Sequence, residues 1–105
     1  MHITAVQLIT LIAVAELGSM VAAARKLGYA PSTVSAHINA VERLVGGPVV
    51  ARTADGSRLT SAGRQVVAVA RMIVGLYEHL DDLHVPTPSQ PAPPGRGVTA
   101  RGTRD

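Results

Sequence analysis

Apolar side chains recur at helical spacing in the first part of this chain. Residues 3–17 place leucine, isoleucine and alanine on one face, and Gly18 follows as a C-terminal stop. Residues 20–27 form a shorter helical segment, for which Ser19 is a suitable N-cap and Gly28 a left-handed terminator. The pattern therefore predicts two helices joined by a tight turn.

A third helix is predicted to begin at Pro31, where the missing N–H of proline costs nothing in the first turn. Its apolar side chains form one stripe that faces the core: Val34, Ile38, Val41 and Val45. The opposite side is short and mostly polar, with Ser32, Thr33, Ala36, His37, Asn39 and Arg43. Such a side suits close approach to another surface.

Two short extended segments follow the glycine–proline sequence that ends the third helix. They span residues 49–53 and 57–60 and flank the turn sequence Ala54-Asp55-Gly56. This arrangement predicts a small β-hairpin, which forms a wing beside the helices.

The last predicted helix is capped by Thr60 or Ser61 and carries two apolar stripes. The first stripe alternates steps of three and four, as in a coiled-coil seam: Val66, Val69, Ile73, Leu76, Leu80 and Leu83. The second stripe comprises Val67, Ala70, Val74 and Tyr77. Two stripes exceed what one helix needs to pack on its own small domain, so the seam is predicted to mediate dimerisation. The alternative is that it packs on the first helix of its own chain.

The predicted fold class is mainly α: a winged helix-turn-helix of three helices and a hairpin, followed by a long dimerisation helix. The 105 residues, 47% of them apolar, suffice for one compact core. We expect a helix-turn-helix domain over residues 1–60 and a linker helix over 61–85. Residues 86–105 are rich in proline, glycine and arginine and are predicted to be a disordered tail.

Positive charge is concentrated locally. The net charge is +3, and residues 1–85 hold seven Lys/Arg against six Asp/Glu, so the total alone does not predict nucleic-acid binding. Between Arg43 and Arg71, however, five arginines accompany a single acidic residue, Asp55. Clustered arginines favour phosphate contact. The alternative is an ordinary solvated face.

Several function classes find no support in the sequence. The chain has no cysteine, and Glu16 interrupts the first apolar stretch well short of the roughly 20 residues that a membrane span requires. His79 and His84 do not share a helix face suited to a metal. We expect a cytoplasmic protein with no metal, no cofactor, no membrane partner and no enzymatic activity.

The segments AVAELGSMVAAARKLGYAPSTVSAHINAVERLVG and VVARTADGSRLTSAG resemble the N-terminal DNA-binding region of LysR-type transcriptional regulators. The resemblance covers nearly all of residues 3–84. It implies a winged helix-turn-helix whose third helix enters the major groove, whose wing touches the DNA backbone, and whose last helix pairs with a second subunit.

The chain also departs from that family pattern. The family commonly has arginine where this chain has Ala36 and a polar residue where it has Pro31, and aromatic residues where it has Leu11, Met20 and Val50. The family normally continues into a large effector-binding domain, which we expect to be absent because the chain stops at Asp105.

The candidate DNA-binding residues lie on the third helix and the wing: Ser32, Thr33, Ser35, Ala36, His37, Asn39, Arg52 and Arg58. The backbone N–H groups of Ser32 and Thr33 are expected to be free for phosphate. His37 is the best single candidate for base contact, the alternative being a histidine that faces solvent. Arg52 and Arg58 are expected to straddle the DNA backbone or the adjacent minor groove, unless Arg52 pairs with Asp55.

The sequence therefore predicts a homodimeric, sequence-specific transcriptional regulator that binds double-stranded DNA without its own small-molecule sensor. The alternative is an interaction protein that heterodimerises with full-length LysR-type regulators. A decayed fragment without function would be monomeric or aggregated.

Overall fold

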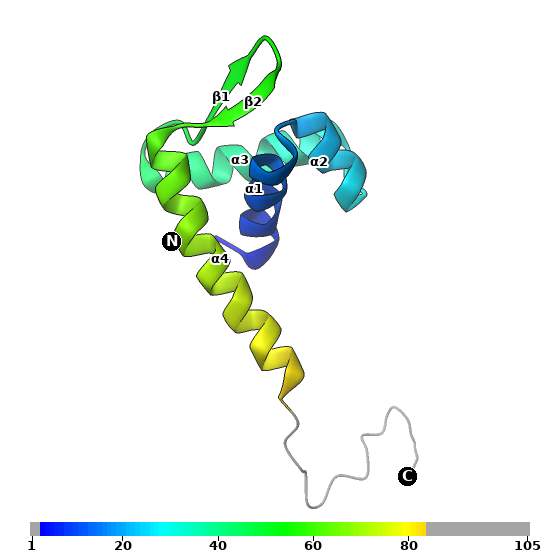
Figure 1. Ribbon diagram of the computed structural model, residues 1–105, viewed down its shortest axis with the longest axis vertical. Helices are drawn as coiled ribbons and strands as arrows, with labels where there is room; N and C mark the ends of the chain where they lie inside the picture. Colours follow the sequence, from blue (N-terminus) through cyan, green and yellow to red (C-terminus); the bar gives the residue numbers. More distant parts are fainter. Residues whose placement is uncertain (1–2, 84–105) are drawn as a thin grey trace, which may run out of the picture.

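The computed structural model describes residues 3–83, and the elements of this part of the chain follow one another as helices, a hairpin and a final helix (Figure 1). They are α1 (Ala5–Leu17), α2 (Met20–Leu27), α3 (Pro31–Val45), β1 (Val50–Thr53), β2 (Gly56–Leu59) and α4 (Ser61–Asp82). The predicted winged helix-turn-helix with a long final helix is confirmed. The predicted tail over residues 86–105 lies outside the described residues.

Local capping sets the helix ends. Ser19 Oγ accepts the N–H of Ala22 at 3.1 Å, as predicted for the start of α2. α1 begins later than predicted, because Thr4 and Gln7 form a capping box there. Thr60, and not Ser61, caps α4 by accepting the N–H of Gly63 at 2.9 Å. The backbones of Gly18 and Gly28 have φ 67° and 77°, so glycine ends α1 and α2 in the left-handed conformation, as predicted.

The core forms around α1, which contacts α2, α3 and α4 (Figure 1). The largest apolar side chains with less than 2% exposure are Leu11, Val14, Val34, Val41 and Val49. Burying a valine or leucine completely contributes about 1.5–3 kcal/mol. The helices are therefore held mainly by side chains that converge on α1.

The hairpin is antiparallel, with Val50 opposite Leu59 and Thr53 opposite Gly56. β2 begins at Gly56, one residue earlier than predicted, because Gly56 still pairs with β1. The hairpin is also docked on the α1–α2 turn, since the N–H of Ser57 donates to Gly18 O at 2.9 Å. A Cβ at Gly56 would overlap that same carbonyl oxygen. The wing is therefore anchored at its turn as well as at its base.

A second anchor lies at Val49, between α3 and the wing. The Val49 N–H donates to Glu42 Oε2 at 2.9 Å, and Val49 O accepts the N–H of Thr60 at 3.0 Å. The Thr60 hydroxyl also donates to Pro48 O at 2.7 Å. We call this cluster the Val49 junction, and it consists of Glu42, Pro48, Val49, Thr60 and Gly63. It joins α3, the wing and α4.

Gly63 completes the junction because the first turn of α4 passes directly over the Val49 carbonyl. A Cβ at Gly63 would overlap Val49 O, which is backbone and has little freedom to move. Gly75, on the same helix, has open space around it.

We predict that Gly63→Ala lowers the free energy of unfolding by about 1–3 kcal/mol, because the added methyl must displace the Val49 backbone. Gly75→Ala is the matched control and should raise that free energy by about 0.5–1 kcal/mol through helix propensity. Urea denaturation followed by circular dichroism measures both. Equal stability of Gly63→Ala and the wild type would contradict the described contact.

We also predict that Glu42→Ala lowers the free energy of unfolding by about 1–3 kcal/mol, because it leaves the Val49 N–H without its acceptor. Glu42→Gln keeps an oxygen at the same place and should lose less than half as much. The same denaturation measurement separates the two variants. A similar loss in both would mean that the charge of Glu42, and not its hydrogen bond, is what stabilises the junction.

Candidate nucleic-acid interface

The outward face of α3 carries short side chains in the middle of the domain surface. Val34, Ile38 and Val41 are buried, so the residues on the opposite side of the helix point away from the core. Four of them are exposed: Ser32, Ala36, Asn39 and Arg43. These four form an exposed strip with Ala36 as its one apolar member, whereas Thr33 and His37 of the predicted polar side are half-buried.

One flank of this strip faces the wing. Two shallow cavities of about 290 and 460 Å³ lie there, and Met20, Ser35 and Arg52 line both. Ser35 is half-buried between α3 and the hairpin. The structure therefore brings Ser35 and Arg52 together, although they are 17 positions apart in the sequence.

The two wing arginines lie on opposite faces of the hairpin. Arg52 pairs with Ser57 and Arg58 with Ala51, and neighbouring pairs of a hairpin point to opposite sides. Arg52 therefore faces α3 and Arg58 faces away from it, with both side chains exposed. Within residues 3–83 the single ion pair joins Arg71 to Glu16 at 2.9 Å, so Arg52 is not paired with Asp55.

The first turn of α3 leaves one backbone donor unengaged. Ala30 provides no side-chain cap and Pro31 has no N–H. The N–H of Thr33 donates to Ala30 O at 2.9 Å, so the expected free group at Thr33 is used inside the protein. The N–H of Ser32 has no partner in the described part of the chain. A helix N-terminus with such a donor favours anions.

His37 is neither buried in the core nor free in solvent. Its Nδ1 lies 2.8 Å from the Thr10 hydroxyl, and its ring meets Tyr29 edge-on, with centroids 5.3 Å apart. The ring is half-buried on the flank of α3 that faces away from the wing. Sequence reasoning singled out His37 but missed Thr10, whose helical position gave no sign of this contact.

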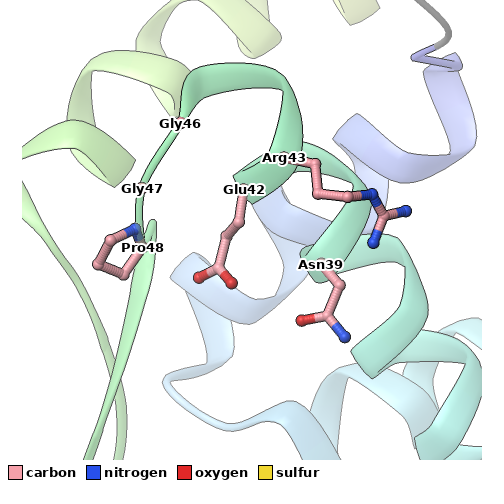
Figure 2. Close-up of a pocket in the computed structure, with 6 residues that line it drawn as sticks. All are labelled: Asn39, Glu42, Arg43, Gly46, Gly47 and Pro48. Atoms are coloured by element: carbon pink, nitrogen blue, oxygen red, sulfur yellow. The ribbon is translucent and has the colours of Figure 1, made fainter.

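The C-terminal end of α3 borders a shallow basin of about 510 Å³ (Figure 2). The Glu42 side chain points toward the strand that follows Pro48, where it accepts the Val49 N–H. The Arg43 guanidinium points away from Glu42 (Figure 2), and both Arg43 and Asn39 are exposed. Glu42 therefore belongs to the structural junction, whereas Asn39 and Arg43 remain available on the surface.

The long helix α4 uses its two apolar stripes differently. Val67 and Ala70 are buried against the domain, and Val74 is half-buried. Of the predicted seam, Val66 and Ile73 are half-buried. Its other members are exposed by 54% (Val69), 69% (Leu76), 61% (Leu80) and 53% (Leu83). The second stripe thus packs on the domain as far as Val74, whereas Tyr77 is 54% exposed and most of the seam is uncovered.

An apolar groove continues from this uncovered seam. It has a volume of about 510 Å³ and is lined by side chains from α1, α3 and α4, including Leu8, Val45, Val66, Val69 and Ile73. Exposed apolar surface of this extent is typical of an interaction site.

Residues 3–83 contain neither a transmembrane helix nor a metal-ligand cluster. None of their helices is long and apolar enough to cross a membrane. Their histidine and acidic side chains form no group of three that could hold a metal ion.

Comparison with known families and proteins gives consistent matches. Residues 6–64 match the family of bacterial regulatory helix-turn-helix proteins of the lysR type. The small neutral protease regulatory protein of Streptomyces coelicolor is 41% identical over 64 residues, which are 61% of this chain and 20% of that protein. The transcriptional regulator EstR of Acinetobacter baylyi is 41% identical over 68 residues, 65% of this chain and 23% of EstR. The chain thus spans about a fifth of the length of these relatives.

Solved structures show the same fold. The crystal structure of the DNA-binding domain of CbnR in complex with DNA has a TM-score of 0.71 and 34% identity, covering 76% of this chain and 92% of that one. Full-length CbnR with its target DNA has the same TM-score of 0.71 and 34% identity, covering 76% of this chain and 28% of CbnR. The likeness therefore extends over the helices and the wing together.

Proposed function

Because this chain belongs to the lysR family of bacterial helix-turn-helix regulatory proteins, we propose that it binds a specific DNA sequence as a homodimer and thereby regulates transcription. Residues 1–60 contact the DNA in this proposal, and the helix within residues 61–85 joins the two subunits. The proposal assigns no reaction to the chain. Binding to bacterial chromosomal DNA places its action in the cytoplasm.

The exposed strip of α3 is the observation that carries the proposal. The major groove of B-DNA is about 12 Å wide and admits one helix. Short exposed side chains let that helix lie close to the base edges, and Ser32, Ala36 and Asn39 are of this kind. The Asn39 amide can pair with adenine, and the Ala36 methyl can contact the methyl group of thymine.

Backbone contacts are proposed on both sides of the strip. The Ser32 N–H at the start of α3 is available to a phosphate. Arg52, in the cavities beside Ser35, would reach a phosphate beside the groove that α3 enters, and Arg58, on the opposite face of the hairpin, would reach the next phosphates or the minor groove. Such contacts position the protein on the duplex, and the base contacts provide the sequence preference.

The uncovered seam of α4 supports the dimer. Leu76 and Leu80 belong to the C-terminal half of α4 and are 69% and 61% exposed, and this half of the helix extends beyond the other helices and the wing (Figure 1). A second copy can cover them and continue into the apolar groove around Val69. Two domains joined in this way would bind two half-sites of a pseudo-palindrome. A related regulator could cover the same seam, which is the second candidate function.

We predict that Arg58→Ala weakens binding to all DNA sequences alike, by about 3- to 10-fold at low salt, because a phosphate contact carries no sequence information. The slope of log affinity against log salt should decrease in magnitude by about 1. The DNA is a duplex obtained by random-oligonucleotide selection with the wild-type protein, compared with an unrelated duplex. Arg71→Ala removes the same charge from the pair with Glu16 and is the control. An unchanged slope in Arg58→Ala would contradict a role for this face of the wing.

We predict that Leu76→Asp converts the dimer to a monomer, because it places a charge in the apolar seam. Leu76 is preferable to Ile73 as a test, since Ile73 also packs on its own domain. Ala68→Asp adds the same charge to an exposed position of α4 outside the seam and is the control. Analytical sedimentation gives the mass of each variant in solution. For Leu76→Asp both the mass and the affinity for the selected duplex should fall, whereas Ala68→Asp should change neither.

Three results would contradict the homodimer. They are an unchanged mass for Leu76→Asp, a monomeric wild-type protein, and equal loss in both variants. A wild-type protein that is monomeric alone but forms mixed dimers with another lysR-family regulator would establish the second candidate function.

A further inference from the structure

The His37 ring is held by residues outside its own helix. Thr10, on α1, is fully buried, and its hydroxyl lies 2.8 Å from His37 Nδ1. Tyr29, in the loop before α3, meets the ring edge-on at 90°. A surface histidine would sample several rotamers, whereas this ring is fixed relative to α3.

The hydrogen bonds of Thr10 determine where the proton of the neutral imidazole lies. The Thr10 hydroxyl has one hydrogen, and its oxygen lies 2.9 Å from the carbonyl oxygen of Val6, which can only accept. When that hydrogen is donated to Val6 O, the contact with His37 requires Nδ1 to be the donor. The neutral ring then carries its proton on Nδ1, and Nε2 is an acceptor.

We propose that Thr10 is a positioning residue that holds His37 as the Nδ1–H tautomer, so that Nε2 accepts an amino group of adenine or cytosine in the major groove. This inference rests on the proposed DNA binding by α3. In the major groove guanine presents acceptors at N7 and O6 and thymine an acceptor at O4, whereas adenine and cytosine present amino groups. An acceptor at Nε2 therefore disfavours guanine at the contacted position.

The surroundings of His37 leave this role to Nε2. The atom has no hydrogen-bond partner within residues 3–83. Its neighbours one turn away on α3 are Thr33 and Ala40, and Ala36 precedes it. Neither alanine offers a polar group, so the Thr33 hydroxyl is the one polar side chain of α3 that accompanies His37 at this spacing.

The free protein tests the tautomer. Long-range ¹H–¹⁵N spectra of the histidine side chains distinguish a protonated from an unprotonated Nε2, and the His37 signal is the one lost in His37→Ala. We expect an unprotonated Nε2 in the wild type and in Thr10→Ser, which keeps the hydroxyl. In Thr10→Val the proton should shift toward Nε2. A wild-type His37 with its proton on Nε2 would overturn the proposal.

Binding to DNA tests the consequence. In the selected duplex, each adenine or cytosine of the half-site is replaced in turn by guanine, with its partner base. At the position read by His37 the replacement should weaken binding of the wild type and Thr10→Ser by about 3- to 10-fold, as expected for one hydrogen bond. In Thr10→Val and His37→Ala the same replacement should cost less than about 2-fold.

The tautomer measurement and the DNA-binding measurement together distinguish a failure of the proposed function from a failure of the proposed base contact. A protein that shows the expected tautomer but binds no DNA contradicts the proposed function and, with it, this base contact. A protein that binds DNA but keeps the same preference at every position in Thr10→Val and His37→Ala overturns the present inference alone. Thr10 is buried, whereas His37 is only half-buried, so His37→Ala disturbs the core less than Thr10→Val does. His37→Ala therefore serves as the second variant if Thr10→Val does not fold.

Discussion

The Val49 junction is the contact on which the arrangement of the functional surfaces depends. The N–H of Val49 is bound by Glu42 of α3, its carbonyl by Thr60 at the start of α4, and its side chain is fully buried. Three elements therefore share one residue. Because Gly63 packs directly on the same carbonyl, α4 has little room to pivot. The direction of α4 is thus set relative to α3, and in a dimer this direction determines how far apart the two copies of α3 lie.

The two stripes of α4 differ in burial because only the N-terminal half of the helix packs on the domain. Val67 and Ala70 are buried and fix the N-terminal half on the domain, whereas the exposed ion pair of Arg71 with Glu16 adds little. The C-terminal half extends beyond the body of the domain (Figure 1). A helical segment this short is marginally stable in water when nothing packs on it. Pairing with a second α4 would therefore stabilise the helix as well as the dimer.

Features set by neighbouring residues were predictable from the sequence. The Ser19 cap, the turn at Gly18 and the two stripes of α4 all depend on local chemistry or on spacing along one helix. The roles of Glu42 and Thr10 were not predictable. In the sequence, Glu42 looks like an ordinary solvent-exposed acidic residue of α3, and nothing indicates its bond to Val49. Thr10 and His37 are 27 residues apart, and no local pattern links them. Their partners are brought close only by the packing of α3 on α1 and on the wing.

The exposed strip of α3 offers few groups for base recognition, so sequence selectivity depends on the dimer. Ala36 has no donor, and the hydrogen-bonding side chains on or beside the strip are short. One hydrogen bond discriminates bases by about 0.5–1.5 kcal/mol, so a single domain would select its site weakly. When two domains are joined, the second binding event becomes intramolecular, and the preferences of both half-sites add in free energy. A rigid connection from α3 through the Val49 junction to α4 is what such addition requires, since a loose joint would let each domain bind without regard to the spacing of the other.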